Sequence, residues 1–106
     1  MEKDLDFKVL NSEENDQETK IAIKYYLEDE FFTDLINYLN YEDYAMAKDA
    51  TKGLYILAQE FKLFRLYETL LDIYEDLDAE FYDDIYEHHR LMIEEYNRLK
   101  EVYKNV

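Results

Sequence analysis

Histidine is the residue type in this sequence best suited to catalysis or metal binding, and His88 and His89 are its only examples. Neutral imidazole binds transition metals and exchanges protons near neutral pH. A helical di-iron site needs a glutamate three residues before each histidine, but Ile85 and Tyr86 hold those positions. Adjacent helical residues also point about 100° apart. The spacing therefore predicts no metal site. We expect His88 to line the core, bonded to Asp84 one turn earlier, and His89 to face solvent.

Other catalytic groups are scarce. The chain has no cysteine, which excludes disulfides, cysteine-ligated zinc, iron–sulfur clusters and thiol catalysis. Its sole serine is Ser12, and a single glycine, Gly53, cannot make a glycine-rich phosphate loop. The acidic runs lack the spacing of a calcium-binding loop. We therefore expect a protein that is not an enzyme and that holds neither a cofactor nor a metal.

Two lysines on one helical turn form a small basic spot in a very acidic chain. The 106 residues carry 27 acidic and 12 basic side chains, a net charge of −15. One interpretation is an ordinary solvated face, with Lys48 bonded to a nearby acid. The other is a partner-binding site made of Lys48, Lys52, Gly53, Tyr55 and Gln59.

The elements that must position these residues are helices. The chain has no proline and one glycine, so it offers few places for the turns and bulges that sheets need. Its length fits one domain. We predict an all-α, antiparallel four-helix bundle over residues 18–106, preceded by a flexible acidic arm over residues 1–17.

Apolar spacings of three and four residues predict four helices. The first spans 18–39, with a break at Thr33. The second runs from an N-cap at Asn40 to Phe61, and the third covers 63–77. The fourth begins at a cap on Asp78 and continues to about 102. The predicted core positions of the last three helices are Tyr44, Ala47, Thr51, Leu54, Ala58 and Phe61, then Leu63, Leu66, Leu70, Ile73 and Leu77, then Phe81, Ile85, His88, Met92, Tyr96, Leu99 and Tyr103.

The stretch from residue 51 to 61, TKGLYILAQEF, resembles the active helix of the histidine phosphotransfer (HPt) family. The acidic-aromatic segment 42–47 before it resembles the entry to that helix, and the similarity extends over residues 35–103. HPt domains are four-helix bundles that carry phosphate on an exposed histidine. The resemblance implies the same bundle, with Thr51, Leu54, Ala58 and Phe61 in core positions.

This sequence departs from the HPt pattern where the chemistry resides. Lys52 stands at the phosphoacceptor position, Tyr55 at that of the assisting lysine and Ile56 at that of the nearby glycine. A second register aligns Asp49 with the histidine, keeps a lysine and a glycine, and places Lys48 in the core. Neither register supplies a histidine. Lysine is protonated at pH 7, with a reference pKa of about 10.4, and accepts phosphate poorly. The resemblance therefore implies a degenerate member without phosphotransfer.

The charge and the aromatic content of the chain limit the kinds of partner that it can bind. A charge of −15 repels nucleic-acid backbones and anionic membranes, so we expect no direct binding of either. No apolar run is long enough to span a membrane, and no signal peptide is apparent, which favours the cytoplasm. Twelve tyrosines suit the half-buried edges of a bundle. The alternative is a tyrosine-rich partner surface.

Three functional hypotheses follow. The first is a non-catalytic HPt-like module that docks a receiver domain or another signalling protein through the second helix, where Lys52 would complement the acidic receiver pocket. The second is an acidic decoy or inhibitor of a basic nucleic-acid-binding protein. The third is a phosphorelay carrier that uses His88 or His89.

Overall fold

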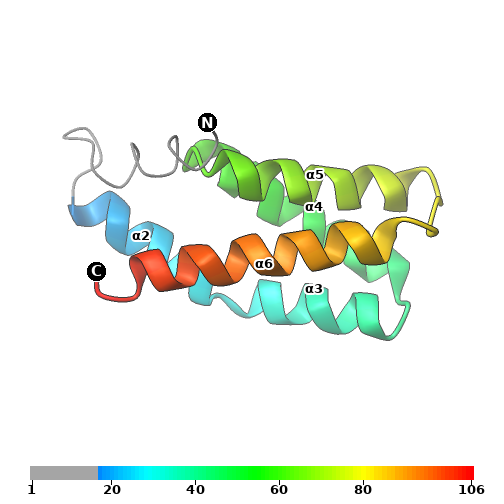
Figure 1. Ribbon diagram of the computed structural model, residues 1–106, viewed down its shortest axis with the longest axis horizontal. Coiled ribbons are helices and arrows are strands. Elements are labelled where there is room, and N and C mark those ends of the chain that lie inside the picture. The colour runs from blue at the N-terminus through cyan, green and yellow to red at the C-terminus, as the bar shows by residue number, and fades with distance from the viewer. Residues whose placement is uncertain (1–16) are drawn as a thin grey trace.

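The computed structural model describes residues 17–106, and its regular secondary structure over that range is entirely helical. Neighbouring helices run antiparallel around a common core (Figure 1), which confirms the prediction of an all-α bundle. The predicted arm lies outside the described residues except for Gln17, which begins the first helix. The helices are α2 (Gln17–Glu28), α3 (Glu30–Asn40), α4 (Tyr44–Glu60), α5 (Phe64–Asp78) and α6 (Ile85–Tyr103).

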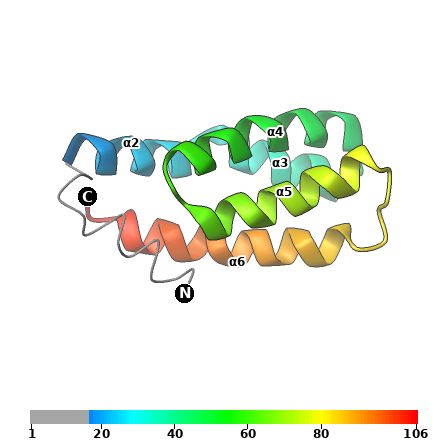
Figure 2. The ribbon, with the colours of Figure 1, turned by 90° about the horizontal axis from the view of Figure 1, so that it is seen from above.

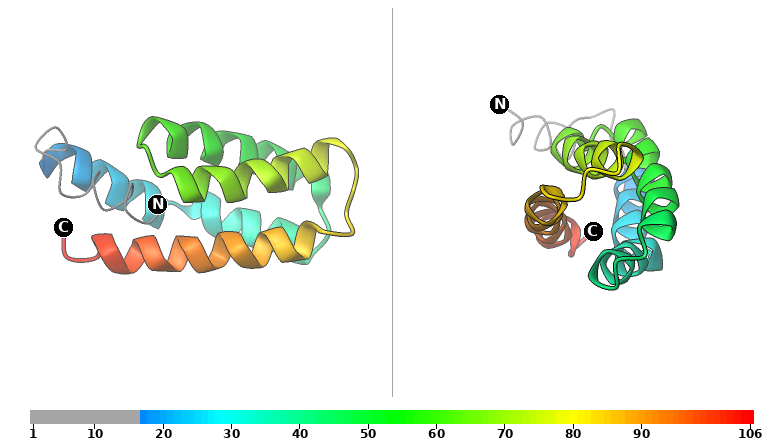
Figure 3. Two further views of the ribbon diagram at one scale, coloured as in Figure 1. Left: turned by 45° about the horizontal axis from the view of Figure 1, so that its top comes forward. Right: turned by 90° about the vertical axis from the view of Figure 1, so that its right-hand side faces the viewer.

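The helices occupy four positions around the core. In the end-on view of Figure 3, α3, α4, α5 and α6 follow one another in order around the core. Figure 1 shows that α2 precedes α3 end to end and meets it at an angle. Helix α3 packs on α4, α4 on α5 and α5 on α6, while α2 packs on α6 and closes the ring. Figure 2 shows that α2 projects past the corner between α4 and α5. Part of α2 therefore has no helix of the α4–α5 pair over it.

The core confirms most of the predicted stripes. The five core residues predicted for the third helix, which are the N-cap Leu63 and four residues of α5, are all buried. Of the six predicted for the second helix, four are buried, and Tyr44 and Phe61 are partly buried. Threonine is tolerated among them because the Thr51 hydroxyl donates to the Ala47 carbonyl oxygen at 2.6 Å. This bond satisfies a polar group that would otherwise be costly to bury.

The first predicted helix is interrupted at Asp29 rather than at Thr33. Asp29 has extended backbone angles, and its Oδ1 accepts a hydrogen bond of 2.9 Å from the Phe31 backbone N–H. Three consecutive acids, residues 28–30, would disfavour the negative end of a helix but suit the positive beginning of the next. The break turns the Phe31 side chain away from the core, so 55% of this residue is exposed.

The bundle turns its corners without glycine. Glu42, Lys62 and Glu80 have φ of 59°, 61° and 56°, in the left-handed region that normally favours glycine. At each corner the next backbone N–H reaches back to a carbonyl five residues earlier, as in a Schellman motif. One example is Leu63 N–H to the Ala58 carbonyl oxygen, at 2.9 Å. Non-glycine residues thus hold three strained corners.

Two predicted N-caps are wrong. Asp43, not Asn40, caps α4, because its Oδ1 accepts from the Met46 backbone N–H. Asp78 is the last residue of α5 rather than the cap of the next helix, which begins only at Ile85 after Asp84. The six residues between these helices form a connection, so Phe81 is half exposed and does not join the core.

Bilayer-spanning character is not found in the described part of the chain. None of the helices between residues 17 and 106 combines sufficient length with sufficient apolarity to cross a membrane.

Candidate protein-binding site

Helix α4 presents a continuous outer face that carries most of the predicted site. With 100° per residue, Lys48, Lys52, Tyr55 and Gln59 fall within a 60° strip, which lies beside the buried face of the helix, about 100° around the axis from its centre. Lys52 and Gln59 are exposed, whereas Lys48 and Tyr55 are partly buried toward α5. Gly53 lies about 100° from Lys52 around the helix. The structure therefore brings four of the five predicted residues together and separates Gly53 from them.

Lys48 is already engaged within the bundle. Its Nζ donates to Asp78 Oδ1 on α5 at 2.7 Å and lies 5.7 Å from the centroid of the Tyr74 ring. The hydrogen bond to Asp78 raises the pKa of Lys48 above its usual value. Tyr55 packs edge-on against Tyr67 and Tyr74. The two lysines thus do not form one cationic spot, and Lys52 is the exposed cation of the strip.

Gly53 faces a groove on the other side of α4. This α2–α4 groove has a volume of about 440 Å³ and is walled by Tyr25 and Tyr26 of α2, Phe31 of α3, and Ala50, Gly53 and Leu57 of α4. A Cβ placed on Gly53 would meet nothing within 4 Å. Glycine in a helix interior costs about 1 kcal/mol relative to alanine. Packing inside the bundle therefore does not account for this glycine.

The floor of the groove is rigidly held. The Tyr26 hydroxyl is buried and donates to the Leu54 carbonyl oxygen of α4 at 2.7 Å, and burial raises the pKa of this phenol. Its ring packs edge-on against Phe32 at 5.2 Å and lies 5.5 Å from Phe61. These contacts fix α2 against α4 beneath the open part of the groove. The walls are left to the exposed side chains of Tyr25, 68% of whose surface is accessible, and Phe31.

The two helices that flank the groove, α2 and α4, carry no net charge and many exposed apolar side chains. Six of the ten large exposed apolar side chains belong to α2, α4 or the first turn of α3. Helices α2 and α4 each carry equal numbers of acidic and basic side chains, whereas α5 carries five acids and one arginine. The only charged side chains that line the groove in the described residues are Asp29 and Asp49. The surface is therefore apolar with an acidic rim.

The two histidines occupy the opposite environments from those predicted. His89 is 7% exposed and its Nε2 has no hydrogen-bond partner within residues 17–106; burial lowers its pKa. His88 is partly exposed, and its Nδ1 lies 2.5 Å from Oδ2 of Asp76, not from Asp84. Partial burial opposes the charged form of His88, but the hydrogen bond and negative charge of Asp76 outweigh it and raise the pKa. Both Ile85–His88–Met92 and Ile85–His89–Met92 fit helical spacing. Periodicity alone therefore could not decide which of the two histidines is buried.

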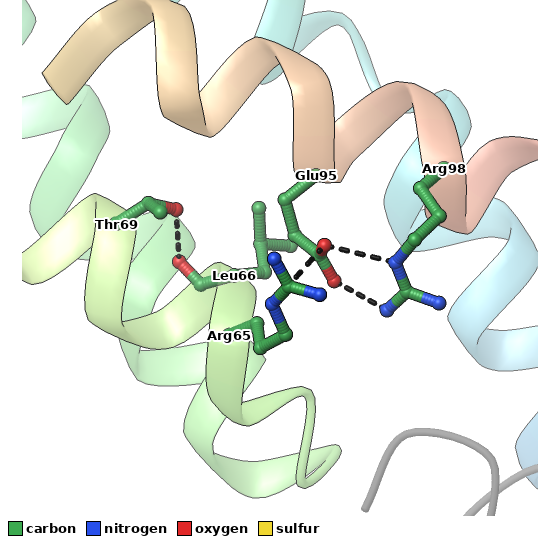
Figure 4. A network of polar contacts seen from close by, with 5 residues as sticks. All are labelled: Arg65, Leu66, Thr69, Glu95 and Arg98. Carbon is green, nitrogen blue, oxygen red and sulfur yellow. Dashed lines mark hydrogen bonds and ion pairs between the residues drawn. The ribbon is translucent and has the colours of Figure 1, made fainter. Parts of the chain in front are cut away.

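A buried carboxylate between α5 and α6 is a feature that the sequence analysis missed. Glu95 is 4% exposed, and Figure 4 shows it facing two guanidinium groups. Arg98 Nε and Nη2 donate to its two oxygens at 2.9 and 2.5 Å, and Arg65 Nε lies 3.7 Å from Oε1. Paired in this way, the carboxylate can be buried without the full cost of desolvation. The network joins two helices and is satisfied within the fold.

Tyrosine burial agrees with edge packing for most of the twelve residues. Three are buried and six are partly buried, which leaves Tyr25, Tyr41 and Tyr86 exposed. Tyr86 lies at the α3–α4 corner, where its hydroxyl donates to Glu42 Oε1 and meets the Tyr44 hydroxyl at 3.4 Å. The hydrogen bond with Tyr44 is the main reason that the pKa of Tyr86 rises to about 12. These exposed rings are distributed over both ends of the bundle rather than gathered in one patch.

No cluster of three or more potential metal ligands occurs within residues 17–106. Comparisons with protein-family models, with curated proteins and with solved structures return no match for this chain. Functional inference therefore depends on the geometry of α4 and its surroundings.

Proposed function

We propose that this protein is a non-catalytic, HPt-like binding module that acts in the cytoplasm and docks a receiver domain or another signalling protein through α4. The observation that carries the proposal is the position of Lys52. It is exposed on the outer strip of α4, and it stands where the HPt resemblance places the phosphoacceptor. An exposed ammonium group there would complement the acidic pocket of a receiver domain.

The surroundings of Lys52 support this proposal. The strip also contains Tyr55 and Gln59, and the Tyr55 ring is held by two tyrosines of α5. Such a preorganised aromatic side chain loses little entropy on binding. Lys48 contributes less than Lys52, because its charge is directed to Asp78.

The test compares association rates of receiver domains with two sets of variants. Lys52→Glu should slow association, with an effect that shrinks as salt rises, because charges at the surface are screened within about 10 Å at 0.1 M salt. The control is Asp83→Lys with Asp84→Lys, in the α5–α6 connection, which should have the smaller effect. If Lys52→Glu associates as fast and binds as tightly as the parent, the docking assignment is wrong.

The proposal also excludes phosphate transfer. His89 is buried, and His88 is engaged by Asp76, so neither resembles an exposed acceptor on α4. We expect no acid-labile, base-stable labelling from phosphorylated receivers or small phosphodonors. Labelling that disappears in His88→Ala would instead establish a carrier with a relocated histidine.

A decoy for a basic nucleic-acid-binding protein is the second candidate, and the acidity of α5 favours it. Four of the five acids on this helix are exposed: Glu68, Asp72, Glu75 and Asp78. Carboxylates in a row along a helix can occupy a site that binds phosphates. A decoy predicts the opposite ranking of the variants by their effect on partner binding. Removing acids from α5 should weaken binding, whereas Lys52→Glu should leave binding unchanged or strengthen it.

A further inference from the structure

The α2–α4 groove is a second surface of α4, distinct from the Lys52 strip. It lies about 100° around the helix from Lys52, and its apolar walls come from two different parts of the chain. We propose that this groove binds an amphipathic helix of a partner protein, with an apolar face and basic flanking residues. The inference does not depend on receiver docking, because the two surfaces share no side chain that both require.

The shape and chemistry of the groove favour a helix with one apolar face. Tyr25 and Phe31 stand on one side and Leu57 on the other, all at least 40% exposed. Large apolar side chains gathered around a concave surface are typical of helix-binding grooves, which accept anchors spaced at i, i+3, i+4 and i+7. Tyr26 fixes the floor through its bond to α4, so the groove is formed before binding.

Gly53 explains how a partner helix could approach closely. The position where its Cβ would lie is open, and glycine removes the side chain that would otherwise hold another backbone away. A helix interior is the least favourable place for this residue in the fold. Close approach of a bound partner gives the glycine a role that the bundle itself does not.

The charges at the rim decide the chemistry of the partner. Asp29 stands on the α2–α3 side and Asp49 on the α4 side. Asp29 uses Oδ1 to cap α3, and a carboxylate retains further acceptor capacity. Lysine or arginine residues flanking the apolar face of a partner would meet both acids. A second copy of this chain is disfavoured as the occupant, because self-association would bring together two molecules of net charge −15.

The test uses displayed helical peptides of 17 residues, the length of α4. Each peptide has apolar residues at i, i+3, i+4 and i+7. One library has lysine flanks, and the matched library has glutamate flanks. Selection against the full chain should enrich the lysine library alone. Asp29→Asn with Asp49→Asn should weaken the selected peptides about threefold to tenfold, with a smaller effect at high salt. Asparagine keeps the cap at position 29.

Gly53→Leu is the decisive variant, because it fills the groove with a good helix former. It should weaken the selected peptides about tenfold or more, while circular dichroism shows an unchanged helix content. Gly53→Ala should weaken them less and raise the melting temperature, which separates binding from folding. Asp83→Asn with Asp84→Asn removes the same charge elsewhere and should leave binding unchanged.

Three results would overturn the inference. One is a selection in which the lysine library is not enriched, and another is undiminished peptide binding by Gly53→Leu. The third is a dimer in sedimentation equilibrium that Gly53→Leu dissociates, which would make a second copy the occupant. Receiver binding that is lost in Lys52→Glu but kept in Gly53→Leu would support the strip alone, so the two proposals can fail separately.

Discussion

Replacing the single glycine of this chain, inside α4, and placing a glycine at the corner after α4 should make the protein more stable. Gly53 lies inside α4 with open space where a Cβ would go, so Gly53→Ala should add about 1 kcal/mol to the free energy of unfolding. Lys62 has φ of 61° at the corner after α4. A left-handed conformation costs a residue with a Cβ about 1–2 kcal/mol, and the greater chain entropy of glycine offsets part of the gain. Lys62→Gly should therefore add about 0.5–1 kcal/mol.

The double variant should combine both effects. The two positions are nine residues apart along the chain and share no contact that would couple them, so their contributions should add to about 1.5–2 kcal/mol. For a domain of this size each kilocalorie raises the melting temperature by about 4–8 °C, which predicts an increase of about 6–16 °C. Thermal and urea unfolding, followed by circular dichroism, would measure it.

Lys62→Ala is the matched control, because it removes the same charge but keeps the Cβ. It should stay within about 0.5 kcal/mol of the parent. If Lys62→Gly is no more stable than Lys62→Ala, the corner does not hold a left-handed residue. If Gly53→Ala lowers stability, the space above Gly53 is not open in the folded protein.

Three further predictions concern the core and the histidines. Leu54→Ala should cost about 2–5 kcal/mol in urea unfolding, and a loss below about 0.5 kcal/mol would place that residue at the surface. Tyr96→Phe should cost about 1–3 kcal/mol, because its hydroxyl satisfies a carbonyl at the end of α2 that has no helical partner. Tyr26→Phe should cost only about 0.5–1.5 kcal/mol, because its acceptor lies inside α4; equal losses would refute this distinction. The stability advantage of the parent over His88→Gln should be larger at about pH 5 than at about pH 8, because the pKa of His88 is raised on folding and its contribution is lost as pH rises. The advantage over His89→Gln should change in the opposite sense, because the pKa of His89 is lowered and protonation below about 6.5 opposes folding; if both profiles have the same sign, one of the two assignments is wrong.

The helices and most of their core could be predicted from the sequence because burial repeats with the helical period. Leu66, Leu70 and Ile73 recur at spacings that leave one face to bury, and all three are fully buried. The helix ends could not be predicted as well. Several aspartates and asparagines lie near each end, and any of them can cap a helix. The left-handed residues at the corners are Glu42, Lys62 and Glu80, which carry no glycine-like signal.

The candidate site was predicted only in part, for two physical reasons. The strip of Lys52, Tyr55 and Gln59 follows from helical spacing alone. The groove depends instead on the break at Asp29, which moves Phe31 out of the core. In a continuous helix Phe31 would follow the buried Leu27 by four residues, on the same face, so helical spacing predicts burial of Phe31 and gives no sign of the groove. The pairing of Lys48 with α5 is likewise a tertiary contact, between residues 30 positions apart.

The distribution of strain in this bundle favours a binding role for α4 over a purely structural one. Three corners hold non-glycine residues in left-handed conformations, each of which glycine would relieve. The only glycine of the chain lies instead in a helix interior, where it weakens α4 and makes no contact through the open space above it. If stability alone decided the sequence, glycine would occupy a left-handed corner and a residue with a Cβ would occupy position 53. A surface that needs close approach to the α4 backbone reconciles both facts, and such an approach would bury the exposed apolar walls beside Gly53, which are Tyr25, Phe31 and Leu57.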